Sequence, residues 1–242
     1  MKDEPGVSFL NAKMPLGSRP AKHRMHVAHE KNSEHTISCM LIGDGAVGKT
    51  SMITSYISNG YPNDYQQTAF DVFTGLVHVD GIPFRIQLLD TAGQDEFDNF
   101  RSMWYGQVDV FILCFSVVNP VSFHNIATKW IPQVRALNPT CPIVLIGTQS
   151  DLRYNVNILI DLDQMRVKPV VRSQAESLAE KISAQGYVEC SALTQKNLKE
   201  AFDSAICAAL KHQACKKAHK LKLLDRAKTF SGVGWKKLFC FI

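Results

Sequence analysis

The sequence predicts an α/β fold, in which one domain over residues 36–211 holds a mostly parallel sheet with helices on both faces. Short apolar runs alternate there with longer stretches whose apolar residues recur at helical spacing. The composition, 45% hydrophobic and 20% charged, is that of an ordinary globular protein. Together these observations favour one sizeable domain flanked by two tails.

Six apolar runs are expected to form strands, because each is short and is bounded by polar or glycine-containing residues. They are TISCMLIG, FTGLVHV, FRIQLLD, VDVFILCFSV, CPIVLIGT and GYVECSA. Four stretches with helical spacing occur between or after them: KTSMITSYI, SFHNIATKWIPQV, RSQAESLAEKISAQ and NLKEAFDSAICAALKH. Strands that alternate with helices in this way favour parallel pairing.

The segments outside the domain differ from it in composition. Residues 1–35 contain three prolines, four histidines and little apolar periodicity, which predicts a flexible tail. The other tail, residues 212–242, is basic: from position 211 onwards the chain has nine Lys and Arg against one acidic residue. Residues 36–210 have a net charge of −5. An acidic body with a basic tail indicates an anionic partner, either nucleic acid or a membrane.

Composition also disfavours several classes of protein. No run of 18 or more apolar residues is present, so no transmembrane helix is expected. The N-terminus lacks the apolar core of a signal peptide, so secretion is not expected. The seven cysteines are scattered and form no C-x-x-C pair, which argues against a disulfide framework or a zinc site.

The segment GDGAVGKT, residues 43–50, has the phosphate-loop pattern G-x-x-x-x-G-K-[ST] between a predicted strand and a predicted helix. Backbone N–H groups of such a loop surround phosphate oxygens, and the helix N-terminus adds positive potential. Lys49 can reach the β- and γ-phosphates, and the Thr50 hydroxyl can bind Mg²⁺. A plain glycine-rich turn is the alternative, and the Lys-Thr pair in register disfavours it.

Two later segments carry residues suited to the same chemistry. In LLDTAGQDEF, Asp90 ends an apolar strand and can hold a metal ion through water. Gly93 can donate its N–H to a γ-phosphate, and Gln94 can orient an attacking water. In GTQSDLR, Asp151 can accept two hydrogen bonds from guanine that adenine cannot donate.

Three functions agree with these motifs to different degrees. The first is a GTP-hydrolysing switch that binds effectors in its GTP state. The second is a nucleotide-loaded membrane scaffold with negligible hydrolysis. A sequence without Gly45 or Gln94 would favour the scaffold, but both residues are present. The third is an ATP-using kinase, and Asp151 argues against it. The switch is therefore the favoured interpretation.

The motifs resemble those of Ras-superfamily small GTPases of the Rho branch. GDGAVGKT, DTAGQDEFD, VDVFILCFSVVNPVSFHNI and ECSALTQKNLKEAFD are similar almost residue for residue. This resemblance spans residues 36–211 and implies the Ras-like P-loop GTPase fold. Residues 153–170 stand where Rho proteins carry a helical insert. The basic tail and the GTQSDLR loop are most similar to the atypical RhoU/RhoV subgroup, RhoV slightly more.

The resemblance implies roles for individual residues. Thr68, Lys49 and Gln94 would form the catalytic set, and Thr68 would bind Mg²⁺ with Thr50 and, through water, Asp90. Larger side chains at Gly45 would obstruct Gln94. The residues implied to bind nucleotide are Gly45, Ala46, Val47, Gly48, Lys49, Thr50, Ser51, Tyr61, Tyr65, Thr68, Asp90, Gly93, Thr148, Gln149, Asp151, Ser191, Ala192 and Leu193.

Three positions depart from the Rho pattern. Gln149 replaces a lysine whose stem lies along the base, so nucleotide should be held less firmly. Gln67 replaces a proline before Thr68, which removes a backbone constraint. Val72 replaces a polar residue of the effector loop, so partner preference should differ from that of Rac-like proteins. None of the three removes a catalytic group.

The segment WKKLFCFI suggests a lipid anchor. Prenylation needs a cysteine fourth from the end, and Phe239 holds that place, so prenyl transfer to Cys240 is not expected. Reversible S-palmitoylation has no such requirement, and basic residues among Leu, Phe and Trp would bring the thiol to an anionic bilayer. The RhoU/RhoV resemblance also implies palmitoylation at Cys240. The alternative is a solvated tail or nuclear-type basic patch with Cys240 incidental.

The resemblance implies a small monomeric GTPase that converts GTP and water to GDP and phosphate with Mg²⁺ as cofactor. Its implied partners are effector kinases of the p21-activated type, GTPase-activating proteins, exchange factors and an anionic membrane surface, but no nucleic acid. It would act at the cytoplasmic face of the plasma membrane and of endosomal and other internal membranes, on actin, adhesion and cell shape.

Overall fold

The computed structural model describes residues 8–12, 36–61, 68–79 and 81–234. Within these ranges the strands form one sheet with the order β1-β3-β4-β2-β5-β6-β7. Their bounds are β1 (Ser8–Ala12), β2 (Thr36–Ile42), β3 (Phe70–Val79), β4 (Ile82–Thr91), β5 (Val110–Ser116), β6 (Ile143–Thr148) and β7 (Tyr187–Glu189). The pairs among β4, β2, β5, β6 and β7 are parallel, and β3 pairs antiparallel with both β1 and β4. The predicted mostly parallel α/β sheet is confirmed.

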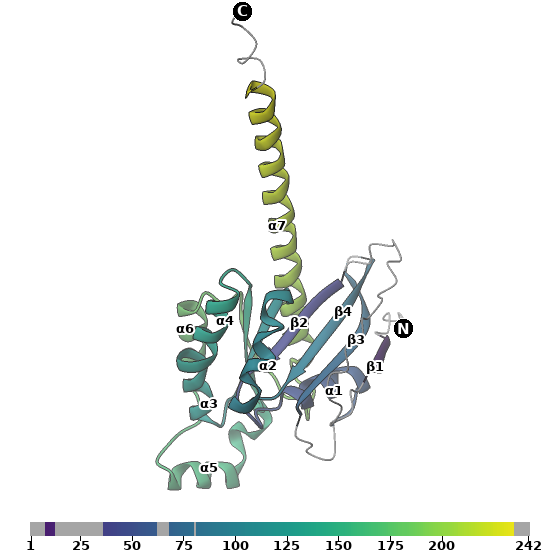
Figure 1. Cartoon of the computed structure of the whole chain (residues 1–242). Coiled ribbons are helices and arrows are strands. Elements are labelled where there is room, and N and C mark those ends of the chain that lie inside the picture. The colour runs from purple at the N-terminus through teal and green to yellow at the C-terminus, as the bar shows by residue number, and fades with distance from the viewer. Residues whose placement is uncertain (1–7, 13–35, 62–67, 80, 235–242) are drawn as a thin grey trace, which may run out of the picture.

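The helices lie on both faces of this sheet (Figure 1). Their bounds are α1 (Lys49–Ser58), η1 (Asp95–Phe97), α2 (Asp98–Ser102), η2 (Tyr105–Gln107), α3 (Pro120–Asn125), η3 (Ile126–Trp130), α4 (Ile131–Leu137), η4 (Ser150–Tyr154), α5 (Val156–Gln164), α6 (Arg172–Lys181) and α7 (Leu198–Gly234). Asn119 caps α3 by accepting from two backbone N–H groups of its first turn, and Asn155 caps α5 in the same way. The predicted helical insert is α5.

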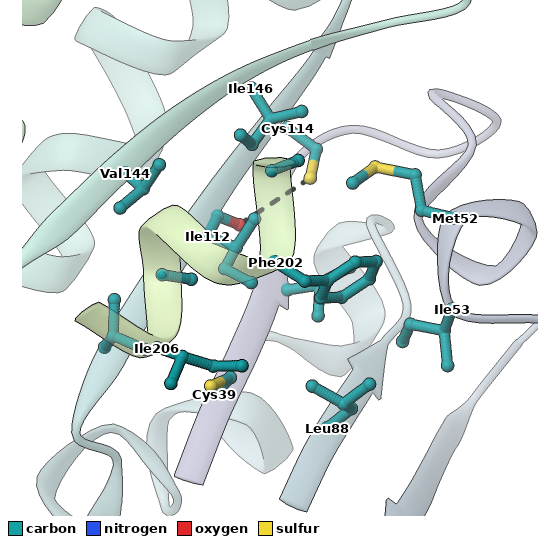
Figure 2. Close-up of a cluster of buried hydrophobic side chains, with 14 of the residues drawn as sticks. Cys39, Met52, Ile53, Leu88, Ile112, Cys114, Val144, Ile146, Phe202 and Ile206 are labelled. Atoms are coloured by element: carbon teal, nitrogen blue, oxygen red, sulfur yellow. Dashed lines mark hydrogen bonds between the residues drawn. The ribbon is translucent and has the colours of Figure 1, made fainter. Parts of the chain in front are cut away.

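Two apolar cores lie on opposite faces of the sheet. One joins α1 and α7 to the sheet and includes Met52, Ile53 and Phe202, as Figure 2 shows. The other joins η3, α4 and α6 to the opposite face and includes Trp130 and Ala175. Every residue of β5 and β6 is buried, as expected for parallel strands covered on both sides. The carboxyl ends of these strands are thereby held at one edge of the domain.

The last helix continues far beyond the predicted end of the domain. α7 has 37 residues and projects away from the body of the molecule in Figure 1. Its N-terminal part packs against the sheet as far as Leu210, and Gln213 still donates to the Thr36 carbonyl oxygen of β2 at 3.2 Å. The helix then continues through residues that the sequence assigned to the tail. No described helix has both the length and the apolar character needed to cross a membrane.

The expectation of a flexible tail over residues 1–35 is wrong for residues 8–12. They form β1, which pairs with β3 from Ser8 opposite Leu76 to Ala12 opposite Val72. An edge strand such as β3 exposes a row of unpaired N–H and C=O groups that another segment can pair with. This pairing uses the backbone, so a strand can form there without the apolar periodicity that the sequence lacks.

The core formed by α7 predicts a large loss of stability in Phe202→Ala. The Phe202 side chain is 1% exposed and stacks on Tyr56 with ring centroids 4.2 Å apart. Removing a buried aromatic ring should lower the free energy of unfolding by about 3–5 kcal/mol, measured by urea denaturation. Cys207→Ala, at an exposed position of the same helix, is the control and should change it little. Equal losses in the two variants would contradict this view of the core.

Candidate functional site

The phosphate-loop segment, residues 43–50, connects the end of β2 to the start of α1 at the carboxyl edge of the sheet. Gly43 has φ +146, and a Cβ there would overlap the carbonyl oxygen of Cys114 on β5. Only glycine allows this close approach, which brings the loop against the sheet. The loop then turns through Ala46 and Gly48, both with positive φ, before Lys49 begins the helix.

Lys49 lies inside the loop rather than in solvent. Its Nζ donates hydrogen bonds to the carbonyl oxygens of Gly43 at 2.8 Å and Asp44 at 2.7 Å, and the residue is 6% exposed. Burial lowers the pKa of Lys49, and Asp90 is the largest of the charges that oppose this effect. An anion bound in the loop would therefore stabilise a charge that the protein alone only partly compensates.

Three oxygen atoms from separate elements meet beside Lys49. The Thr50 Oγ1 atom lies 2.6 Å from Asp90 Oδ2, to which it donates, and 2.7 Å from Thr68 Oγ1. The Asp90 side chain is fully buried, and burial raises the pKa of Asp90 to about 6. Its other oxygen, Oδ1, has no hydrogen-bond partner among the described residues. One carboxylate and two hydroxyls suit a hard divalent cation whose other ligands are phosphate oxygens and water.

Gly93 and Gln94 follow β4 and lie against the phosphate loop. A Cβ on Gly93 would overlap the backbone of Asp44 and Gly45, so this contact requires glycine. The Gln94 Nε2 atom lies 3.7 Å from the place that a Cβ on Gly45 would occupy. Its Oε1 is buried and has no hydrogen-bond partner among the described residues. The side chain is thus close to the loop and retains an acceptor for a small polar molecule.

A second set of residues lies on the other side of the loop. The Gln149 Nε2 donates to the carbonyl oxygen of Ala46 at 3.1 Å, and its Oε1 accepts from Ser116 Oγ at 2.5 Å. Thr148 donates to the carbonyl oxygen of Val47 at 2.5 Å. Asp151 accepts from Ser191 Oγ at 2.5 Å. The contacts of Thr148 and Gln149 join the ends of β5 and β6 to the phosphate loop, and the bond between Asp151 and Ser191 joins the segments that follow β6 and β7.

The remaining predicted residues take less central places. Ser51 lies in the first turn of α1, and the Ala192 carbonyl oxygen accepts from Ser55 Oγ of that helix at 2.6 Å. Tyr61 and Leu193 are 47% and 55% exposed. Tyr65, Gln67 and Cys240 lie outside the described residues.

The site also includes residues that were not among those predicted. Asn125 Nδ2 and Trp130 Nε1 donate to the two carboxylate oxygens of Asp44 at 2.7 and 2.8 Å. Arg101 is 1% exposed and donates to the carbonyl oxygens of Ala92 and Gln94. Helical spacing indicates that Trp130 is buried but does not indicate where its N–H points.

The arrangement as a whole suits one kind of chemistry. It combines a backbone cradle for phosphates, a buried lysine, a set of hard oxygen ligands and an amide side chain beside the loop. The Asp151 carboxylate, on the other side of the loop, can recognise the base of a nucleotide. These parts come from the ends of adjacent parallel strands, where nucleotides bind in such sheets.

Comparison with known proteins agrees with this geometry. A sequence model of the Ras family matches residues 38–211. The Rho-related GTP-binding protein RhoV of Rattus norvegicus is 56% identical over 207 residues, which cover 85% of this chain and 87% of that protein. The RhoV proteins of Mus musculus and Homo sapiens match with the same identity and coverage.

The contacts of Gln149 predict that Gln149→Lys will slow nucleotide release. Lysine has a longer apolar stem to lie along a base, and its ammonium can still donate to the Ala46 carbonyl oxygen. Release of fluorescently labelled guanosine diphosphate should be several-fold slower than in the wild type, a change of about 1 kcal/mol. Gln149→Met provides an apolar stem but no hydrogen-bond donor, so it separates the contribution of the stem from that of the hydrogen bond to Ala46. Equal release rates in wild type and Gln149→Lys would show that Gln149 does not limit affinity.

Proposed function

This chain belongs to the Ras family of small GTPases and hydrolyses GTP, and from that premise we propose that it is a switch whose GTP-bound form recruits effector proteins at membranes. Two segments that surround the loop support the proposal. Thr68 precedes β3 and Gly93 follows β4, so both reach the loop from the same end of this antiparallel pair, where the Ala92 N–H donates to the Ala69 carbonyl oxygen at 3.1 Å. A γ-phosphate between them would hold both segments in one arrangement.

The residues present fit Mg²⁺, which supplies charge neutralisation between the phosphates when it is bound. Thr50 and Thr68 would be its direct protein ligands, and Asp90 would hold it through water. The unpartnered Asp90 Oδ1 and the raised pKa of Asp90, which burial causes, support this assignment. A cation beside this carboxylate would favour its ionised form.

We assign the hydrolytic step to Gln94 and Lys49. Gln94 orients the attacking water through the Oε1 atom that has no partner among the described residues. Lys49 holds the β- and γ-phosphate oxygens inside the loop, with the N–H groups of the loop around them. Arg101 is a buried arginine near the loop, but its guanidinium already donates hydrogen bonds to two backbone carbonyl oxygens and to Asp98. The arginine that stabilises the transition state therefore comes from a GTPase-activating protein.

Guanine recognition is assigned to Asp151. Thr148 and Gln149 precede it in the chain and hold this segment against the phosphate loop. Ser191 fixes the Asp151 carboxylate from the loop that carries Ala192 and Leu193. The carboxylate accepts from the two guanine donors, and Tyr61 packs at the edge of the base. Tyr65, to which the family resemblance gives a role at the phosphates, lies outside the described residues.

Membrane attachment is assigned to the C-terminal part of the chain. Residues 211–242 contain nine Lys and Arg, most of them on the projecting part of α7. Each basic residue near an anionic leaflet contributes about 1 kcal/mol. One acyl chain on Cys240 adds the second signal that stable attachment needs. At the plasma membrane and internal membranes the GTP form then recruits effector kinases of the p21-activated type, with effects on actin, adhesion and cell shape.

Gln94→Leu should slow GTP hydrolysis by about tenfold or more, because it removes the amide that is placed beside the loop to orient the water. Single-turnover release of phosphate from GTP-loaded protein measures this rate. Gln164→Leu, at an exposed position at the end of α5, is the matched control and should hydrolyse at the wild-type rate. An unchanged rate in Gln94→Leu would remove Gln94 from the mechanism.

Cys240→Ser should move the protein from the membrane fraction to the soluble fraction and leave GTP binding intact. Hydroxylamine-sensitive acylation of the wild type, absent from Cys240→Ser, provides the chemical measurement. Cys215→Ser removes an exposed thiol from α7 and should stay on membranes. If Cys240→Ser remains membrane-bound, or if an inhibitor of prenyl transfer releases the wild type, the thioester anchor is wrong.

A further inference from the structure

A carboxylate of the phosphate loop is held from outside the loop. Both oxygens of Asp44 accept hydrogen bonds, one from Trp130 Nε1 at 2.8 Å and one from Asn125 Nδ2 at 2.7 Å. Trp130 is fully buried, and an indole N–H that is buried needs an acceptor. The loop backbone at Asp44 also contacts Gly93 and accepts from Lys49. Through Asp44, the helical segment formed by α3 and η3 is therefore hydrogen-bonded to the phosphate loop.

The helix is deformed where it makes this contact. Asn125 and Trp130 are five positions apart, which in an α-helix places them about 140° apart around the axis. Residues 126–130 instead form a π turn, closed by a hydrogen bond from the Ile131 N–H to the Ile126 carbonyl oxygen. Such a turn brings residues five apart onto one side, where both can reach the same carboxylate. Single π turns inside α-helices occur frequently at functional sites.

The other side of Trp130 contacts the segment that carries Gln94. The Arg101 Cζ atom lies 4.9 Å from the centroid of the Trp130 ring, within the range of a cation–π contact. Arg101 is 1% exposed, forms an ion pair with Asp98 and donates to the carbonyl oxygens of Ala92 and Gln94. The ring face that positions Arg101 thus also positions the backbone on either side of Gly93.

Lys129 adds a second connection between the same two elements. Its Nζ lies 4.4 Å from the Trp130 ring centroid and forms an ion pair with Asp95, the residue after Gln94. Asp95 is largely exposed, so this pair contributes less than the buried contacts of Arg101. The buried connection therefore runs from Asp44 through Trp130 to Arg101 and the Gln94 carbonyl.

We propose that Trp130 is a positioning residue for hydrolysis: it fixes the phosphate loop relative to the backbone of Gln94. The indole N–H holds the loop at Asp44, and the ring face holds Arg101, which holds Gln94. Neither Trp130 nor Arg101 contacts the nucleotide in this account. The inference rests on the proposed role of Gln94 in orienting the water, and it adds the residues that keep that glutamine in register with the loop.

The test is a double-mutant cycle on single-turnover hydrolysis of GTP by the full chain. Trp130→Phe keeps a ring but loses the N–H, and it should hydrolyse GTP about fivefold more slowly than the wild type. In a Gln94→Leu background the same change should have no further effect, because there is no oriented glutamine left to displace. A role confined to stability would give the same fold-change, or none, in both backgrounds. Thermal unfolding of each variant is recorded beside the rates.

Two further comparisons keep the test decisive if Trp130→Phe does not fold. Asp44→Ala removes the acceptor and should slow hydrolysis in a Gln94-dependent way, whereas Asp44→Asn can keep both hydrogen bonds after Asn125 turns its amide and should stay near the wild-type rate. Phe111→Leu, in the same core as Trp130, should lower the unfolding temperature without changing hydrolysis.

The possible failures are distinguishable. If Gln94→Leu is slow but Trp130→Phe and Asp44→Ala hydrolyse normally, the positioning role is wrong and the proposed function stands. If Gln94→Leu itself hydrolyses at the wild-type rate, the catalytic assignment fails, and the positioning role fails with it. A loss in Trp130→Phe that persists undiminished in the Gln94→Leu background also overturns the positioning role.

Discussion

The close approach of the phosphate loop to the end of β5 is the constraint on which the rest of the site depends. Gly43 permits it because any side chain there would overlap the Cys114 carbonyl oxygen, and Gly93 packs against the other side of the loop for the same reason. With the loop fixed between them, Lys49 is directed inward and Thr50 reaches Asp90 at 2.6 Å. Parallel strands that end at one edge make this convergence possible, and the two buried cores on either face hold those strands in register.

The same closeness makes the site electrostatically unfavourable when no ligand is bound. Burial lowers the pKa of Lys49 and raises the pKa of Asp90, so in both cases burial disfavours the charged form. Two buried oxygens, on Asp90 and Gln94, have no hydrogen-bond partner among the described residues. Phosphates, a divalent cation and water would relieve each of these defects.

The sequence predicts what depends on local residues and misses what depends on tertiary contacts. The loop and Asp90 are predicted because GDGAVGKT and LLDTAGQ are patterns of neighbouring residues. The parallel sheet is predicted because apolar runs alternate with stretches of helical spacing. β1 is missed because it pairs through its backbone with β3. The π turn at Ile126–Trp130 and the direction of the Trp130 N–H are missed because helical periodicity does not report on hydrogen bonds. The length of α7 is missed because the basic residues after position 210 look like a tail.

The central claim is that a γ-phosphate orders the segments around Thr68 and Gly93 against the phosphate loop. Hydrogen–deuterium exchange of the full chain, compared between its GDP form and a form loaded with a non-hydrolysable GTP analogue, tests it most directly. The account predicts slower exchange with the analogue in peptides that contain Thr68 and Gly93, and equal exchange in peptides from β5. Equal exchange of the Thr68 and Gly93 peptides in the two forms would contradict it.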